Sequence, residues 1–170
     1  MHSAKLFVRN VRPDCAGGSR DYRDYSVRKI IAGTRGYNDR EYFFEYMDGE
    51  HAALIAENPG EAILYISGAA KTGADALAIE WCELRGHPYL AMPANWDDIS
   101  VPGAIVKINK RGKQYNARAG MTRNEDMAKI ATDLIVWWDL KSSGTREMYR
   151  LGKQYKLVRS CVAIDTDEEE

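Results

Sequence analysis

Three short segments of the sequence combine glycines with hydroxyl groups and cations, the residue types that commonly hold phosphate groups. They are 33–36 (GTRG), 68–75 (GAAKTGAD) and 142–145 (SSGT). Each comes after a strand-like apolar run, and the second and third lead directly into helical patterns. The first N–H groups of a helix are unpaired and carry a partial positive charge, so they favour an anion. Arg35 and Lys71 can add charge-assisted hydrogen bonds to it.

A tight turn is the other interpretation of such glycines, and the sequence has neither the P-loop spacing nor GxGxxG. If the three loops follow parallel strands, however, they meet at one edge of the sheet, where open α/β sheets bind their ligands. We therefore expect a nucleotide or phosphate site at that edge. The residues expected to bind its ligand are Gly33, Thr34, Arg35, Gly68, Lys71, Thr72, Gly73, Asp75, Arg123, Asn124, Ser143, Gly144 and Thr145.

The two glycines of the second segment admit two interpretations. In the first, Gly68 and Gly73 bracket a loop whose N–H groups face a phosphate, while Thr72 adds a hydroxyl and Lys71 a charge. In the second, the glycines serve only a tight turn and Lys71 points to solvent. Asp75 either caps the helix that follows or holds a sugar hydroxyl.

Two further pairs of residues could contact a ligand. Arg123 and Asn124 stand at the start of a helical pattern that continues at Met127. An Arg in the first turn of a helix opposes the helix dipole unless it faces an anion, and the alternative is simple exposure to water. Trp96 and Tyr115 lie in a long irregular stretch, where they could stack on a base or pack that stretch onto the body.

Alternating strand and helix patterns must position these residues. Apolar runs predict five strands, at 28–32, 62–67, 88–92, 133–138 and 156–162. Helical patterns run from an N-cap at Asp39 to about Ala56 with fraying near Gly49, from Ala74 to about Gly86, around 127–131, and up to Leu151. Residues 93–118 interrupt the order as a long loop with a small hairpin around 104–108.

The apolar runs are continuous, as in strands covered on both faces, and strand–helix alternation implies parallel pairing through right-handed crossovers. The predicted fold class is α/β, a three-layer Rossmann-like sandwich with a mainly parallel sheet of five strands or slightly more. Residues 1–25 are an N-terminal extension, 26–163 the nucleotide-binding domain, and 164–170 an acidic tail expected to be disordered.

Composition excludes several classes of protein. A formal net charge of −1 over 170 residues argues against a dedicated duplex-DNA binder, and no apolar run is long enough to cross a membrane. Three widely spaced cysteines without a CxxC motif indicate reduced thiols and a cytoplasmic protein. Three scattered histidines give no metal-ligand spacing. We expect no metal, no cofactor and no membrane partner.

The motifs GTRG, SGAAKTGAD, PANW, AGMTRNEDM and SSGTREM, in this order, resemble the YspA/YpsA-related branch of the SLOG superfamily. The superfamily is similar in fold to DprA and to the Lonely-guy phosphoribohydrolases, and the resemblance runs from about Lys29 to Val162. It implies a Rossmann-like domain that binds a nucleotide or a nucleotide-derived ligand, and a homo-oligomer. The long loop is similar to those of bacteriophage-encoded members, which implies a phage protein in the host cytoplasm.

The resemblance also bears on catalysis. In Lonely-guy enzymes an Arg-Lys pair opens a helix, with Met three residues after the Lys, and Arg123, Asn124 and Met127 match that arrangement. Their PGGxGTxxE motif supplies phosphate-binding amides and a catalytic Glu. Here SSGTREM places Met148 at the Glu position, and Glu147 would point about 100° away around a helix. The candidate catalytic residues are Arg123 and Glu147.

Three functions stay open. The leading hypothesis is a protein that binds a nucleotide-type ligand without turnover, to sense or sequester it. The alternative is a nucleotide N-glycosidase of the phosphoribohydrolase type, which needs acid or base help at the glycosidic bond. The third is single-stranded DNA handling of the DprA kind, in which cations and an aromatic residue between 107 and 118 would contact DNA. A charge run of this kind is also typical of a solvated loop.

Overall fold

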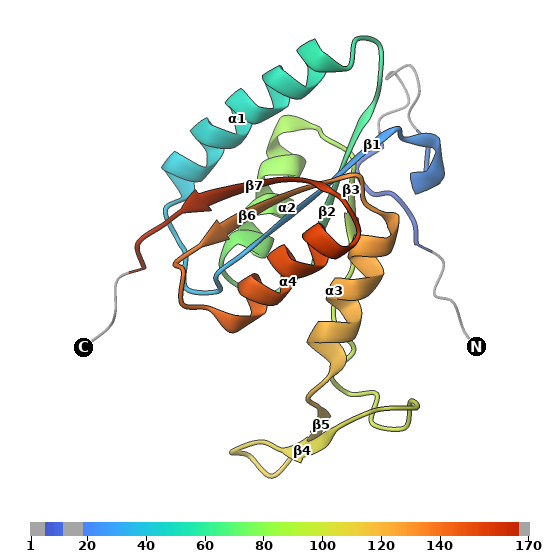
Figure 1. Cartoon of the computed structure of the whole chain (residues 1–170), viewed down its shortest axis with the longest axis vertical. Helices are drawn as coiled ribbons and strands as arrows, with labels where there is room; N and C mark the ends of the chain where they lie inside the picture. Colours follow the sequence, from blue (N-terminus) through green and yellow to red (C-terminus); the bar gives the residue numbers. More distant parts are fainter. Residues whose placement is uncertain (1–5, 12–18, 167–170) are drawn as a thin grey trace.

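A single parallel sheet organises the chain. The computed structural model describes residues 6–11 and 19–166, so residues 167–170 of the predicted acidic tail lie outside the described part. Five strands pair in the order β3-β2-β1-β6-β7, and every pairing between neighbours is parallel (Figure 1). The strands are β1 (Val27–Gly33), β2 (Ile63–Ser67), β3 (Tyr89–Ala91), β6 (Asp133–Trp138) and β7 (Val158–Ala163).

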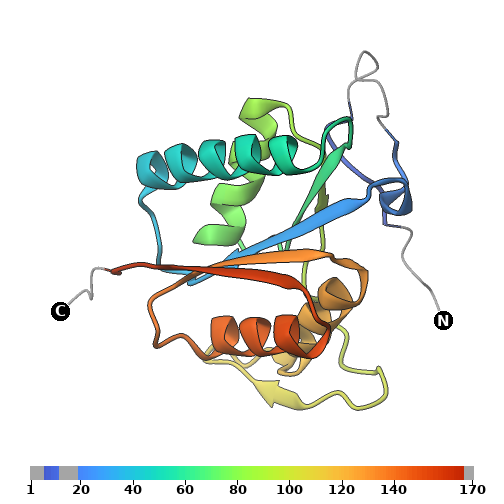
Figure 2. The ribbon, with the colours of Figure 1, turned by 45° about the horizontal axis from the view of Figure 1, so that its top comes forward.

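Two helices cover each face of this sheet. On one face lie α1 (Arg40–Glu57) and α2 (Ala74–Arg85), and on the other lie α3 (Ala119–Ile130) and α4 (Ser143–Gln154), as Figure 2 shows edge-on. The predicted three-layer Rossmann-like α/β sandwich is thereby confirmed, with five strands in its main sheet.

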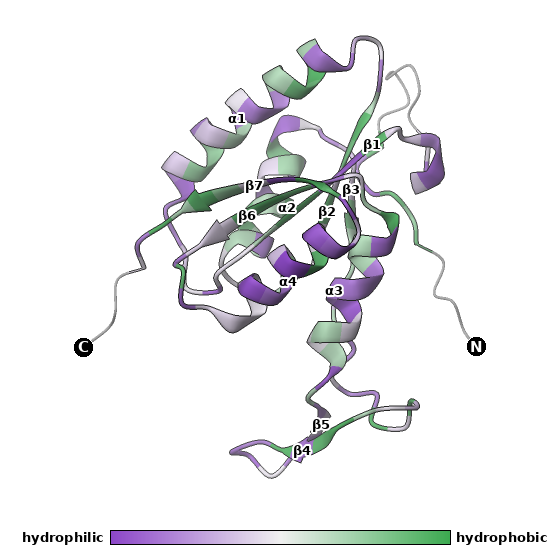
Figure 3. Cartoon of the chain, viewed as in Figure 1, coloured by the Kyte–Doolittle hydropathy of each residue, from purple (hydrophilic) through white to green (hydrophobic). Residues whose placement is uncertain are grey.

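The core explains why the strand sequences are continuously apolar. Ile31 and Ile135 pack into the cluster beneath α1 and α2, whereas the adjacent Ile30 and Leu134 pack into the cluster beneath α3 and α4. Successive side chains of a strand point to opposite faces, so a strand covered on both faces must be apolar at every position. Figure 3 accordingly shows green stretches in the central strands, with purple in part of β1, while the helices alternate green with purple.

Local signals fix several helix ends. The side chain of Asp39 accepts a hydrogen bond from the backbone N–H of Tyr42, so Asp39 is the N-cap of α1, as predicted. Gly86 ends α2 in the left-handed conformation with φ 75°, which glycine adopts readily. Helix α1 runs unbroken through Gly49, so the predicted fraying there was wrong.

The described part of the N-terminal extension packs against the domain, although its sequence is polar. Val8 and Tyr25 are buried in the cluster beneath α3 and α4. Arg9 forms an antiparallel bridge with Tyr89 of β3, and the side chain of Asn10 donates to the carbonyl oxygens of Cys82 and His87. A short 3₁₀ helix, η1 (Tyr22–Asp24), precedes β1.

Between β3 and α3 the chain leaves the body of the protein. There β4 (Val106–Ile108) and β5 (Gln114–Asn116) form the expected antiparallel hairpin, which projects away from the sandwich at the bottom of Figure 1. Within the described residues, no helix has both the length and the apolar character needed to cross a membrane.

Candidate functional site

The strand order places a crevice between β1 and β6. From β1 the chain proceeds to β2 on one side, and β6 with β7 lies on the other, which makes this the topological switch point where ligands bind in such sheets. A cleft of about 680 Å³ opens there, within the range of small-molecule sites. Its lining comes from residues 32–36 at the end of β1 and just after it, Asp75 of α2, Trp96, parts of 117–127, and residues 142–145, 147 and 148 around the start of α4.

The loop after β1 is fixed by hydrogen bonds to the end of β6. The backbone N–H of Thr34 donates to the carbonyl oxygen of Trp137 at 2.9 Å, and its side-chain oxygen accepts from the N–H of Asp139 at 3.2 Å. Gly33 cannot be replaced without movement, because a Cβ there would lie 2.8 Å from the Cβ of Ala74. Arg35, in contrast, is exposed at the rim of the cleft.

The first turn of α4 faces the cleft with its N–H groups available. Ser142 is the N-cap residue, and its side chain makes no capping hydrogen bond. Ser143, Gly144 and Thr145 all line the cleft; the first two are exposed and Thr145 is buried. Together with the partial positive charge of the helix start, this geometry suits an anion.

The buried carboxyl group of Asp75 and the half-buried guanidinium of Arg123 lie behind this rim. Asp75 is 8% exposed, and burial raises the pKa of its carboxyl group, while the nearby Arg123 acts against that rise. Burial likewise lowers the pKa of the Arg123 guanidinium, and here Asp75 opposes the shift. Arg123 also donates to the carbonyl oxygens of Gly68 and Met92, the latter at 3.3 Å. Both ionisable groups line the cleft.

The predicted location of Arg123 in a first turn was wrong. Helix α3 begins at Ala119, four residues earlier, so Arg123 lies in its second turn. The N-cap position of α3 is Arg118, and no side chain caps this helix start. The sequence therefore has no typical capping residue there from which the start of α3 could be predicted. Asn124, the other residue predicted here, lines the cleft and accepts from the Nε of Arg123 at 2.9 Å.

The glycines after β2 permit close approach of neighbouring groups. A Cβ at Gly68 would lie 2.6 Å from a terminal nitrogen of Arg123, and one at Gly73, where φ is +77°, would lie 2.5 Å from the Cα of Arg35. Two of the N–H groups between them bond to nearby residues, that of Ala69 to the Ser67 hydroxyl and that of Ala70 to the Asp75 carboxylate. This is the arrangement that the turn interpretation predicts.

Only one residue of this second loop reaches the cleft. Asp75 lines it, whereas Gly68, Lys71, Thr72 and Gly73 do not, and Lys71 and Thr72 are exposed. The segments after β1 and β6, by comparison, contribute all the residues predicted from them. The cleft therefore draws on two of the three glycine-rich loops for backbone groups and on the third for a carboxylate.

Met148 stands where the phosphoribohydrolase motif has its catalytic Glu, and its side chain packs into the core. Met148 is 1% exposed and lines the cleft floor. Glu147 also lines the cleft, but it accepts hydrogen bonds from the Arg150 guanidinium at 2.6 Å and 3.0 Å. Arg150 lowers the pKa of the Glu147 carboxyl group, which makes this carboxylate a weaker base.

Residues from the long loop and the start of α3 complete the lining. Ala117, Gly120 and Met121 were not predicted to contact a ligand, whereas Trp96 was predicted either to stack on a base or to pack its stretch onto the body; all four line the cleft. A Trp in an irregular stretch was the only sequence signal that pointed to this part of the lining. Among the described residues, no group of three or more His, Cys, Asp or Glu side chains could hold a metal ion.

Comparison with known families agrees with this architecture. Residues 27–98 match the model of the YspA, cpYpsA-related SLOG family. This segment belongs to that family. The SLOG segment spans β1 to the start of the long loop, so it contains the loops after β1 and β2 but neither Arg123 nor α4. The resemblance inferred from the motifs is confirmed.

One solved structure similar to the chain is that of DNA processing protein A from Helicobacter pylori, with a TM-score of 0.49 and 16% identity. The similarity covers 86% of this chain and 70% of that one. No curated protein sequence matches the chain. These comparisons give no support to the expected phage origin, and they leave the homo-oligomer untested.

Proposed function

We propose that the cleft binds a nucleotide or a nucleotide-derived ligand and holds it without efficient turnover. The observation behind this proposal is the pairing of an anion-binding rim with a floor that lacks a catalytic carboxylate. The rim consists of Arg35 and the uncapped first turn of α4, and the floor of Met148. Family membership of the SLOG segment supports a nucleotide-type ligand.

In this proposal each group has one task. The N–H groups of Ser143, Gly144 and Thr145 and the guanidinium of Arg35 bind a phosphate. Asp75 accepts hydrogen bonds from sugar hydroxyls, and Arg123 counteracts the rise in the pKa of that carboxyl group that burial causes. Such a site suits a sensor or a protein that sequesters a nucleotide signal.

Calorimetric titration of the full chain with AMP, ADP-ribose and a cyclic dinucleotide tests the proposal. We expect at least one of them to bind, and Arg35→Ala to weaken that binding about 10-fold or more, because a charge-assisted hydrogen bond is lost. Arg146→Ala is the matched control, since Arg146 is an exposed cation near the start of α4 but outside the cleft lining. No binding of any of the three at millimolar concentration would contradict the proposal.

One observation favours the hydrolase as a second candidate. Asp75 is a buried carboxyl group with a raised pKa inside the cleft, as a general acid requires. This candidate predicts release of free base from a nucleoside monophosphate, measured by chromatography. Asp75→Asn and Arg123→Ala should abolish release, and Glu147→Gln should leave it intact if Arg150 has already made Glu147 a poor base. Absence of free base after prolonged incubation excludes this candidate.

The single-stranded DNA hypothesis finds no comparable support. The cations on which it rests are Lys107, Lys110, Arg111, Lys113 and Arg118, a set that lies on the projecting hairpin and the turn after it. Lys113 is already paired with Asp97 at 2.9 Å, and both of these side chains are exposed, as in an ordinary solvated loop.

A further inference from the structure

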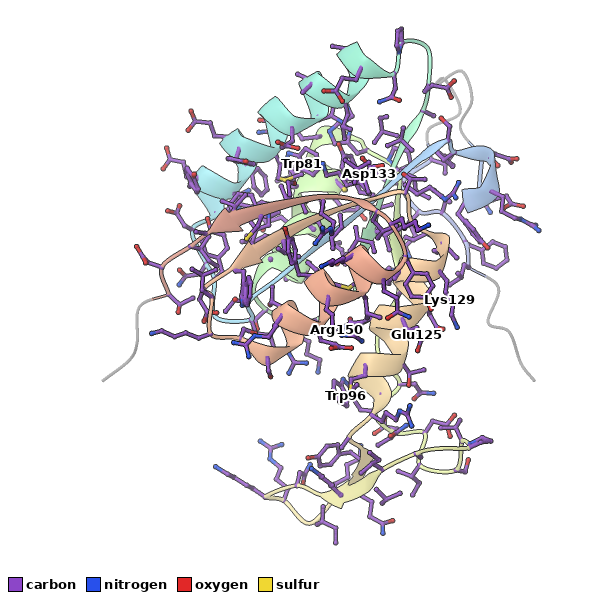
Figure 4. All side chains as sticks on the ribbon, viewed as in Figure 1. Trp81, Trp96, Glu125, Lys129, Asp133 and Arg150 are labelled. Carbon is purple, nitrogen blue, oxygen red and sulfur yellow. The ribbon has the colours of Figure 1, made fainter. Side chains whose placement is uncertain are left out.

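Trp96 is the one aromatic side chain among the described residues that line the cleft. Its main chain is anchored, because its carbonyl oxygen accepts a hydrogen bond from the N–H of Asn116 at 2.7 Å. Its ring lies against the first turn of α3, where a Cβ at Gly120 would be only 3.0 Å from it. Figure 4 shows Trp96 beside this end of α3, between the helix and the hairpin.

A cation from the loop after β1 lies over this ring. The guanidinium carbon of Arg35 lies 5.7 Å from the centre of the Trp96 ring, within the range of a cation–π contact. Arg35 also acts electrostatically on Asp75 and Arg123. Arg35 therefore interacts both with Trp96 at the rim of the cleft and with the charged groups inside it.

Trp96 keeps 36% of its surface exposed, although burial of a Trp ring is one of the largest apolar gains available to a protein. From the chain around the start of α3 the lining takes the apolar Ala117 and Met121 and the polar Arg123 and Asn124, and from α4 it takes Ser143, Gly144 and the apolar Met148. The cleft thus contains both an aromatic plane and the N–H groups of a helix start. These two features match a ligand with one flat ring and one phosphate.

We infer that Trp96 is the stacking platform for the heteroaromatic base of a nucleoside monophosphate, and so the residue that selects nucleotides over plain sugar phosphates. This inference rests on the proposed function, which places the phosphate at Arg35 and α4. Arg35 turns from the ring to the phosphate on binding, and the base takes over the vacated face. Stacking on an aromatic side chain tolerates any base, because every base has a π face.

Four nucleotides and one sugar phosphate separate the base contact from the phosphate contact. The probes are AMP, GMP, CMP, UMP and ribose 5-phosphate, titrated into the full chain by calorimetry. We expect the best nucleotide to bind about 10-fold or more tightly than ribose 5-phosphate, because base–aromatic stacking contributes at that level. Trp96→Ala should remove this advantage without weakening the binding of ribose 5-phosphate, because the substitution also frees Arg35 from the ring. Trp96→Phe should retain most of the advantage.

Ile99→Ala is the matched control, because Ile99 lies in the same loop, is also 36% exposed and does not line the cleft. Quenching of Trp fluorescence by the nucleotide gives a second readout, which should disappear in Trp96→Phe although binding persists. Thermal unfolding of each variant excludes a general loss of fold.

The possible failures are distinguishable. If none of the five probes binds, the proposed function fails and the inference fails with it. If ribose 5-phosphate binds and no nucleotide binds more tightly, the phosphate site stands and the role of Trp96 is overturned. A loss of affinity in Trp96→Ala that is equal for nucleotide and sugar phosphate overturns it as well, since it would indicate a structural role.

Discussion

Burial raises the pKa of Asp75 and lowers the pKa of Arg123, so it disfavours the charged form of both side chains. The charge of each side chain counteracts this shift in the other. Burial favours a protonated carboxyl group and a deprotonated guanidinium, whereas their mutual attraction favours the ion pair. Both side chains converge on Gly68, where a Cβ would lie within 2.8 Å of either. The glycine therefore serves to admit two buried charged groups, a requirement of tertiary packing that no local sequence pattern expresses.

A half-buried titratable residue, His51, lies on the α1 side of the sheet, away from the cleft. Its Nδ1 is 2.8 Å from the hydroxyl of Tyr65, and its ring stacks on His87 with centroids 3.8 Å apart. Trp81 contacts the same ring edge-on. Burial lowers the pKa of His51 from its ordinary 6.5, and Asp48 only partly opposes this.

This lowered pKa predicts how stability depends on pH. The folded state binds a proton at His51 less readily than the unfolded chain does, so this residue's contribution is complete above pH 6.5 and is lost as the pH falls below that value. We expect the free energy of unfolding in urea to decrease from about pH 7.5 to about 5.5, and to decrease less in His51→Asn, whose amide can still bond Tyr65. An identical slope in both proteins would contradict the prediction, and an unchanged m-value is the control.

At the scale of elements, α4 combines an uncapped start with a firmly held backbone. The carbonyl oxygen of Ser142 accepts from the Trp138 indole N–H at 3.1 Å and from the N–H of Arg146 at 3.2 Å, while its side chain makes no cap. Ser is a good N-cap residue, so a missing cap at this position leaves donors free for another acceptor.

Because the start of α4 is uncapped, we expect a capping substitution to raise the free energy of unfolding and to lower the affinity for a phosphate ligand. Ser142→Asp should cap the helix and raise the free energy of unfolding by about 0.5–1 kcal/mol. The same carboxylate should weaken binding of a phosphate ligand at least about 10-fold, because it competes for the N–H groups and repels the anion. Ser142→Asn is the control, since it can cap without a charge, and should weaken binding less. Equal affinities of the two variants in calorimetry would show that no anion binds at this helix start.

The sequence predicted the elements whose signals are local, such as helix caps and apolar runs, and missed those that depend on tertiary contacts. Asp39 and Gly86 mark helix ends by their own chemistry, and continuous apolar runs identified every strand of the main sheet. Val8 and Tyr25 were missed because single apolar residues in a polar segment have no period. Trp96 joined the cleft only through the path of a long loop, which depends on tertiary contacts.

At the scale of the whole molecule, the projecting hairpin has exposed apolar side chains. Ile105, Val106 and Ile108, on β4 and the residue before it, are 51%, 45% and 66% exposed, and Val106 and Ile108 share one face of the strand. Grouped apolar side chains on a projecting element typically mark a contact with another protein surface. Together with the homo-oligomer implied by the family resemblance, this leads us to expect self-association through the hairpin.

Analytical ultracentrifugation tests the association. We expect the average mass of the chain to exceed that of a monomer, and Ile108→Asp to reduce it towards the monomer, because a charge on the contact would have to be desolvated. Leu84→Asp is the matched control, since Leu84 is similarly exposed, at 56%, but lies on α2. A monomeric wild-type chain, or equal effects of the two substitutions, would contradict the prediction.

The bridge between Arg9 and Tyr89 has a consequence for aggregation. β3 is an outermost strand of the sheet, and the outward N–H and C=O of such a strand can recruit a strand from another molecule. Here those groups of Tyr89 bond to Arg9, at 3.2 Å and 2.8 Å. The N-terminal segment thereby occupies the outward backbone groups of β3 at Tyr89, where a strand from another molecule would otherwise pair. The pairing itself needs only main-chain groups, so a segment that is mostly polar can provide it.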